Sequence, residues 1–121
     1  MKARFISLPI KKVTLLNAQF KKGVLELCVL VLLDKQDFYG YELIKRITNK
    51  IELSEGSVYP VLRRILKQGY CTTYLKESTE GPSRKYYHLT DEGKDYLLEL
   101  KEAYENFTRG VDSLMKEERN E

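Results

Sequence analysis

The chain has 121 residues, of which 42% are hydrophobic and 32% charged, with a formal net charge of +3. This length suits one domain, and this balance is typical of a globular protein, which excludes an intrinsically disordered chain. The longest apolar run, 24–33, is too short to cross a membrane.

The distribution of charge is more informative than the total. Residues 1–89 hold 16 Lys or Arg and 8 Asp or Glu, whereas residues 90–121 hold 5 and 10. A basic body followed by an acidic end indicates that the body meets a polyanion and that the end has another role. Chance clustering on a solvated surface is the alternative.

Residues 1–18 are predicted to form a basic, disordered extension. Pro9 interrupts any helix there, and apolar residues show little periodicity. The segment has a positive start but no long apolar centre, so we expect no signal peptide and a cytoplasmic protein. A basic arm that reaches along DNA and a segment added by an upstream start codon both remain open.

Three helices are predicted next in the chain. Residues 19–33 are apolar on nearly every side, which favours a buried helix. Leu43, Ile44 and Ile47 recur at helical spacing and predict a second helix over 41–50. The third helix is expected to begin near Ser54 as N-cap, although Pro60 must then distort its first turn or delay its start.

A hairpin and a last helix follow. Residues 70–75 and 84–89 are rich in aromatic and β-branched residues, and the polar segment 76–83 between them contains a Gly-Pro step. Thr90 is the predicted N-cap of the last helix. Its apolar residues are spaced 3-4-3-4-3, the a/d pattern of a coiled coil, which predicts a dimer interface. These seam residues are Leu97, Leu100, Tyr104, Phe107, Val111 and Leu114.

The reactive side chains form no recognisable site. Cys28 lies inside the apolar run and is interpreted as a core residue, and Cys71 opens the first hairpin strand. His88 has no partner at metal-ligand spacing, so neither a metal nor another cofactor is predicted. Because nucleophile-base pairs, phosphate-binding glycine loops and metal clusters are all missing, the pattern does not indicate an enzyme.

The order helix, helix, helix, hairpin, helix predicts a mainly α fold with a small β-hairpin (α+β). The expected domain is a winged helix-turn-helix over 19–89 with a dimerisation helix over 90–118. A helix fits the major groove of double-stranded DNA, and a basic hairpin binds the flanking backbone. The predicted DNA-contact residues are Ser57, Tyr59 and Arg64, expected at the bases, and Arg63, Lys67, Lys76, Ser83, Arg84 and Lys85, expected at the backbone. A winged helix that binds proteins instead of DNA is the alternative.

Four motifs in this order resemble the PadR-like transcriptional regulators. They are Gly40-Tyr41-Glu42-Leu43, the segment 57–64 with sequence SVYPVLRR, the segment 81–87 with sequence GPSRKYY, and the segment 89–93 with sequence LTDEG. The resemblance covers about residues 19–115 and implies a homodimeric repressor that binds a pseudo-palindromic operator.

The compact subgroup of that family, which has a single short final helix, includes members that bind aromatic molecules at the dimer centre. The best-known drug-binding relatives stack a tryptophan of the last helix on the ligand, and this chain has no Trp. Tyr104 and Phe107 are the residues predicted to contact a small aromatic effector, with plain packing in the seam as the alternative.

Overall fold

The computed structural model describes residues 18–119, so the predicted basic extension lies outside the described range except for its last residue. Within this range the fold is four α-helices with a small antiparallel sheet, which confirms the predicted α+β winged helix. The elements are α1 Ala18–Lys35, β1 Phe38–Tyr39, α2 Gly40–Lys50, the 3-10 turn η2 Glu55–Ser57, α3 Tyr59–Lys67, β2 Cys71–Ser78, β3 Gly81–Leu89 and α4 Asp91–Met115.

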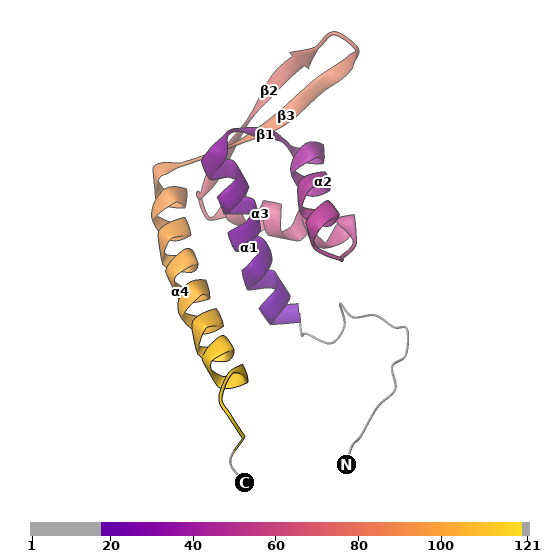
Figure 1. Ribbon diagram of the computed structural model, residues 1–121. Helices are drawn as coiled ribbons and strands as arrows, with labels where there is room; N and C mark the ends of the chain where they lie inside the picture. The colour runs from indigo at the N-terminus through magenta and orange to yellow at the C-terminus, as the bar shows by residue number, and fades with distance from the viewer. Residues whose placement is uncertain (1–17, 120–121) are drawn as a thin grey trace.

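The helix α1 lies between the other helices. Figure 1 shows α2 and α3 on one side of α1 and α4 on the other, with the hairpin β2–β3 projecting from one end of the domain. The buried side chains form one core, whose fully buried members include Leu30, Leu43, Ile44, Leu62 and Ile65. The strand ends near the helices complete it, because Cys71 and Leu89 are also buried.

The start of the third helix differs from the prediction. The α-helix begins at Tyr59, and residues 55–57 form a separate 3-10 turn. The Ser54 side chain makes no cap bond to the backbone, and its hydroxyl lies 3.0 Å from that of Ser57. Pro60 explains the shift, because proline has no N–H to donate and is tolerated only in the first turn of a helix. The predicted N-cap at Ser54 is therefore wrong.

The two strands of the wing, defined here as β2 and β3 with their connection, are longer than predicted. The strands run through most of the segment predicted as a turn and leave only residues 79–80 between them, with an irregularity between Lys76 and Ser78. The short strand β1 pairs with β3 through Phe38–Tyr87 and Tyr39–Tyr86 and makes the sheet three-stranded. Two residues are too short to show an alternating pattern, so the sequence carried no signal for β1.

The joint between the wing and α4 requires a glycine. Thr90 caps α4 as predicted, since its hydroxyl accepts a hydrogen bond from the Gly93 N–H at 3.0 Å and donates one to the Gly69 carbonyl at 2.7 Å. A Cβ at Gly93 would overlap the carbonyl oxygen of Tyr70 and the side chain of Leu89. The backbones at this joint pack too closely for any side chain.

Gly93→Ala is expected to lower the free energy of unfolding by about 1–3 kcal/mol, because the methyl group must displace backbone. Gly23→Ala is the matched control, since a Cβ at Gly23 meets nothing within 4 Å. An alanine there is expected to be neutral or to stabilise α1 by up to about 1 kcal/mol. Urea unfolding followed by circular dichroism measures both, and equal stability of the two variants would contradict the tight joint.

Candidate nucleic-acid interface

The helix α3 has one buried and one exposed face. Val61, Leu62 and Ile65 point into the core. Tyr59, Arg63 and Lys67 are exposed and follow one another every four residues, which places them along one stripe of the helix surface. Ser57, in the η2 turn just before the helix, is exposed as well. The structure thus brings four of the predicted DNA-contact residues to the outside of this segment.

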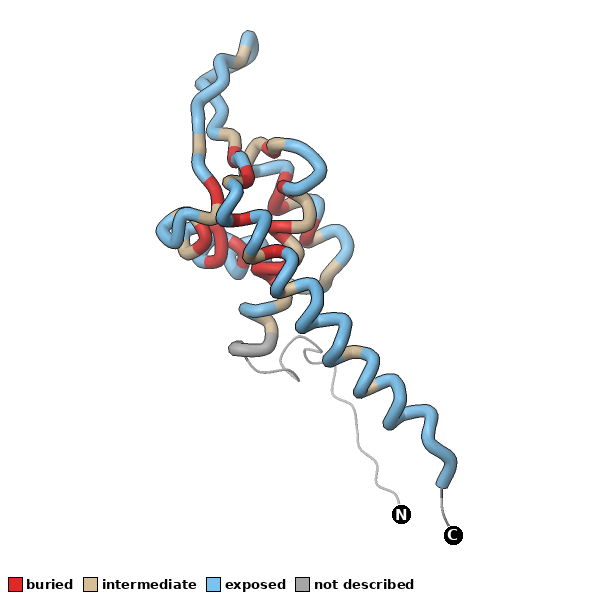
Figure 2. The backbone as a smooth tube through the Cα atoms, turned by 90° about the vertical axis from the view of Figure 1, so that its left-hand side faces the viewer, coloured by how far each residue is buried: buried red, intermediate tan, exposed pale blue. Residues whose placement is uncertain are grey.

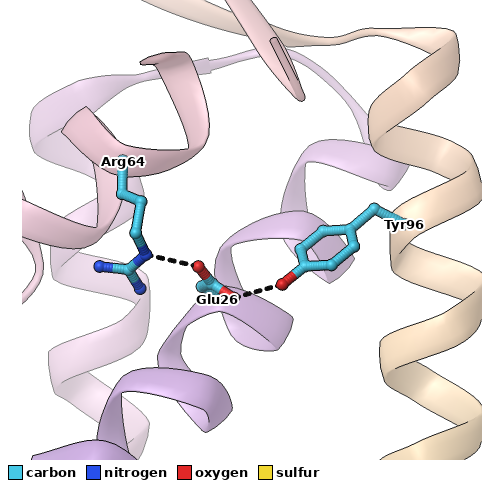
Figure 3. Close-up of polar contacts among 3 residues, drawn as sticks. All are labelled: Glu26, Arg64 and Tyr96. Atoms are coloured by element: carbon cyan, nitrogen blue, oxygen red, sulfur yellow. Dashed lines mark hydrogen bonds and ion pairs between the residues drawn. The ribbon is translucent and has the colours of Figure 1, made fainter. Parts of the chain in front are cut away.

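Arg64 is placed differently from these four. Its Nε donates to the Glu26 carboxylate on α1 at 2.7 Å, and its side chain is only 24% exposed. Figure 3 shows the guanidinium turned toward α1. Its Nη2 is buried and has no hydrogen-bond partner among the described residues. The expectation that Arg64 faces the bases therefore does not match this geometry.

Glu26 also holds the last helix. The hydroxyl of Tyr96 on α4 donates to the other carboxylate oxygen of Glu26 at 2.8 Å, as Figure 3 shows. The Tyr96 ring stacks on Tyr70 with 4.2 Å between the ring centroids. Burial, together with the hydrogen bond to Glu26, raises the pKa of Tyr96 to about 12. One carboxylate on α1 thus connects α3 and α4.

Sequence reasoning missed this connection. Glu26 is 9% exposed and is the one acidic residue within the apolar run 24–33. A single carboxylate in a buried helix costs free energy unless it has partners, so its position was a signal that it binds another side chain. The sequence did not show which cation or hydroxyl the fold would bring to it.

The predicted wing residues are exposed but divide between the two faces of the sheet. Lys76 and Arg84 face each other across β2 and β3. Because side chains alternate along a strand, Ser83 and Lys85 lie on the opposite face from Arg84. Lys85 lines a shallow groove with Tyr59, so this face adjoins α3.

Aromatic rings support the two cations on the other face. Lys76 Nζ lies 5.1 Å from the centroid of the Tyr86 ring, and the Arg84 guanidinium lies 4.9 Å from that of Tyr39. Cation–π contacts of this kind hold a long side chain in fewer conformations. Both cations are therefore held in defined positions before any ligand binds. The face of the wing that carries them is called the outer face below.

A second polar cluster joins the end of α1 to the outer face of the wing. The Asp37 carboxylate accepts a hydrogen bond from the Tyr74 hydroxyl at 2.7 Å and lies 2.8 Å from Nδ1 of His88. Partial burial alone would raise the pKa of Asp37, but the contacts with Tyr74 and His88 outweigh it and lower that pKa. His88 thus has a structural partner that spacing along the sequence did not show.

The predicted seam on α4 splits into two parts. Leu97 is buried in the core of its own chain, and Leu100 packs against that core. Tyr104, Phe107 and Leu114 are 42%, 57% and 68% exposed. Figure 2 shows α4 leaving the buried region and continuing as an exposed helix. These three residues, together with the half-buried Val111, form an apolar stripe on the part of α4 that lies outside the core.

Across 18–119 no cluster of three or more His, Cys, Asp or Glu side chains is arranged to hold a metal ion. Cys28 and Cys71 are both free thiols, and burial raises the pKa of Cys71 to about 11. No helix in the described part of the chain has the length and apolar character needed to span a membrane.

The chain is similar to known regulators. The model of the transcriptional regulator PadR-like family matches residues 29–99. A protein of Lysinibacillus sphaericus named uncharacterized protein X is 31% identical over 99 residues, which cover 78% of this chain and 91% of that protein. The transcriptional regulator YqjI of Escherichia coli is 36% identical over 90 residues, which cover 71% of this chain but only 42% of YqjI.

Solved structures agree with these matches. The PadR-like transcriptional regulator of Bacillus cereus superposes with a TM-score of 0.74 at 40% identity, covering 84% of this chain and all of that one. A PadR family transcription regulator of Clostridium difficile superposes with a TM-score of 0.68 at 31% identity, covering 75% of this chain and 97% of that one.

Tyr96→Phe tests the connection through Glu26. Loss of a hydrogen bond to a buried carboxylate is expected to cost about 1–3 kcal/mol at neutral pH. The pKa of Tyr96 is higher in the folded than in the unfolded chain, so its contribution is complete below about pH 10 and is lost as the pH rises to about 12. The free energy of unfolding, measured with urea at several pH values across this range, should fall less steeply with pH in the variant than in the unmodified protein. Parallel curves for the two proteins would contradict the assignment.

Proposed function

The chain belongs to the PadR-like family of transcriptional regulators, and we propose that it is a repressor that binds a pseudo-palindromic operator as a homodimer. Regulators of this family are DNA-binding proteins and not enzymes. The observation that carries the proposal for this chain is the exposed stripe Tyr59, Arg63 and Lys67 on α3, beside a wing that presents four further polar or basic residues.

The stripe suits the major groove of DNA. An α-helix fits that groove, and side chains from successive turns on one face reach successive base pairs. Because Glu26 holds Arg64, we assign the base contacts to Ser57, Tyr59 and Arg63. Lys67, at the last turn of α3, is assigned to a phosphate.

The two faces of the wing suit different strands of the backbone. Lys85 and Ser83 lie on the face that adjoins Tyr59, and we assign them to phosphates next to the reading helix. Lys76 and Arg84, held over Tyr86 and Tyr39, are assigned to phosphates on the far side of the wing. Preformed positions reduce the conformational entropy lost when these cations bind.

The apolar stripe on α4 supports the homodimer. Large apolar side chains on a helix that extends beyond its own core favour burial against a second copy of the same helix. Two linked recognition helices are what a palindromic operator requires, with half-sites about one helical turn apart. Whether Tyr104 and Phe107 also contact a small aromatic effector stays a prediction, since exposure in a single chain suits packing equally.

The basic face favours DNA over the alternative of a protein-binding winged helix. Tyr41 and Tyr59 are exposed there, but they carry hydroxyl groups, and the ammonium group of Lys45 lies over the Tyr41 ring. A protein-binding surface would be expected to have a more apolar centre with fewer charges.

Arg63→Ala is expected to weaken binding to promoter DNA by about 1–3 kcal/mol. Lys67→Ala is expected to lower the slope of the logarithm of affinity against the logarithm of salt concentration by about one, the effect of losing one phosphate contact. Lys101→Ala is the control, because Lys101 is exposed on α4 away from the interface. Fluorescence anisotropy of DNA from upstream of its own gene, titrated at several salt concentrations, measures both effects. An affinity that is unchanged in Arg63→Ala would show that this face does not read DNA.

Phe107→Asp is expected to separate the dimer, because it places a charge in the apolar stripe. Leu98→Asp is the matched control, since Leu98 is 66% exposed on α4 but lies off the a/d pattern. Leu100 is less suitable than Phe107, because its half-burial in its own core would confuse dissociation with unfolding. Sedimentation velocity should show a monomer only for Phe107→Asp, and a dimer in both variants would contradict the seam.

A further inference from the structure

The wing extends beyond the core that supports the rest of the domain. Figure 2 shows its strands leaving the buried region, and their core residues are Cys71, Tyr87 and Leu89, at the ends next to the helices. The section that carries Lys76 and Arg84 is exposed on both strands. A hairpin without further support is only marginally stable in water. The direction of these cations therefore depends on contacts at the base of the wing.

Asp37 makes such contacts with both strands of the wing. It lies in the connection between α1 and β1, and its carboxylate accepts a hydrogen bond from the hydroxyl of Tyr74 on β2 at 2.7 Å. Its other oxygen lies 2.8 Å from Nδ1 of His88 on β3. Because β3 is the central strand, Asp37 reaches from one edge of the sheet to the strand at the other edge. One side chain next to the end of α1 thus holds both strands at the base of the wing.

Ring contacts continue from Tyr74 to the cations of the outer face. The Tyr74 ring stacks on Tyr86, with 5.6 Å between the centroids and 19° between the planes. Tyr86 carries Lys76. The Tyr86 ring also lies 6.0 Å from that of Tyr39, over which Arg84 is held. Because packed rings limit each other's positions, the orientation set at the Tyr74 hydroxyl is passed on to both cations.

We propose that Asp37 is a positioning residue for DNA binding, which holds the wing so that Lys76 and Arg84 meet the phosphate backbone. This role rests on the proposed function of the chain. Tyr74 and His88 occupy both carboxylate oxygens, so no DNA contact is assigned to Asp37. Its charge by itself acts in the opposite direction, because an anion beside the wing repels DNA. Positioning and simple repulsion therefore predict opposite effects when the side chain is removed.

Two substitutions at Asp37 separate these effects on binding of promoter DNA, measured by fluorescence anisotropy on the full chain. Asp37→Ala is expected to weaken binding by about twofold to tenfold, since long side chains that are no longer held must be immobilised on binding. Asp37→Asn loses the same charge, but its amide oxygen still accepts from Tyr74, so its affinity is expected to stay within about twofold of the unmodified protein. Equal or tighter binding by Asp37→Ala overturns the proposal, as does an Asp37→Asn variant that binds as weakly as Asp37→Ala.

Asp34→Ala is the matched control for charge, because Asp34 is exposed near the end of α1, close to Asp37 in the chain. It is expected to bind DNA at least as tightly as the unmodified protein, since it removes an anion and no contact of the wing. A loss of affinity equal to that of Asp37→Ala contradicts the role of the wing contacts and overturns the proposal. Circular dichroism melting confirms that each variant is folded.

A background without the two cations distinguishes positioning from a general loss of structure. In a protein that carries Lys76→Ala and Arg84→Ala, Asp37 has no cation of the outer face left to place. Asp37→Ala is therefore expected to change the affinity by less than about twofold there, a departure from additivity. If Asp37→Ala costs the same factor in both backgrounds, Asp37 only stabilises the fold and the proposal is overturned.

NMR measures the position of the cations on the protein without DNA. Methylene protons of a side chain held over an aromatic ring are shifted upfield by the ring current. Those of Lys76 and Arg84 are expected to be shifted in the unmodified protein and in Asp37→Asn, and to return toward free values in Asp37→Ala. Shifts that stay unchanged in Asp37→Ala overturn the proposal. If the shifts depend on Asp37 but the chain binds no promoter DNA at any salt concentration, the proposed function fails while the positioning of the wing stands. The two failures are thus distinguishable.

Discussion

The buried carboxylate of Glu26 constrains the arrangement of the whole domain. An ionised group with so little exposure costs several kcal/mol unless hydrogen bonds and an opposite charge compensate for it. Arg64 and Tyr96 supply that compensation from two different helices. Because removal of either partner leaves polar groups buried and unpaired, α3 and α4 are both held to α1. The helix proposed to read DNA is thereby tied to the helix proposed to form the dimer.

This constraint explains which charges are available for DNA. Of the two adjacent arginines on α3, Arg64 is taken inward by Glu26, while Arg63 stays on the exposed stripe. Fewer cations of α3 are therefore available to DNA than its number of Lys and Arg residues suggests. The wing adds cations on both of its faces, with Lys76 and Arg84 on one and Lys85 on the other.

The helix α4 serves two parts of the molecule in succession. Its first turns, capped by Thr90 and fitted around Gly93, belong to the core of the winged helix through Leu97. Its later turns contribute nothing to that core and expose Tyr104, Phe107 and Leu114. One periodic apolar pattern therefore covers an intramolecular contact and then the stripe proposed for dimerisation. A substitution early in the pattern would test folding, whereas one late in the pattern would test association.

The sequence by itself determined the order of elements, the α+β class, the cap at Thr90 and the family, because periodicity, turn residues and short motifs are local properties of a chain. Pro60 even marked where α3 begins, although the N-cap was placed too early. Only the tertiary structure decided that Arg64 turns inward, that His88 meets Asp37, that β1 joins the sheet and that Leu97 belongs to the core. Each of these depends on residues distant in sequence being brought together, and packing, not local preference, selects the partner.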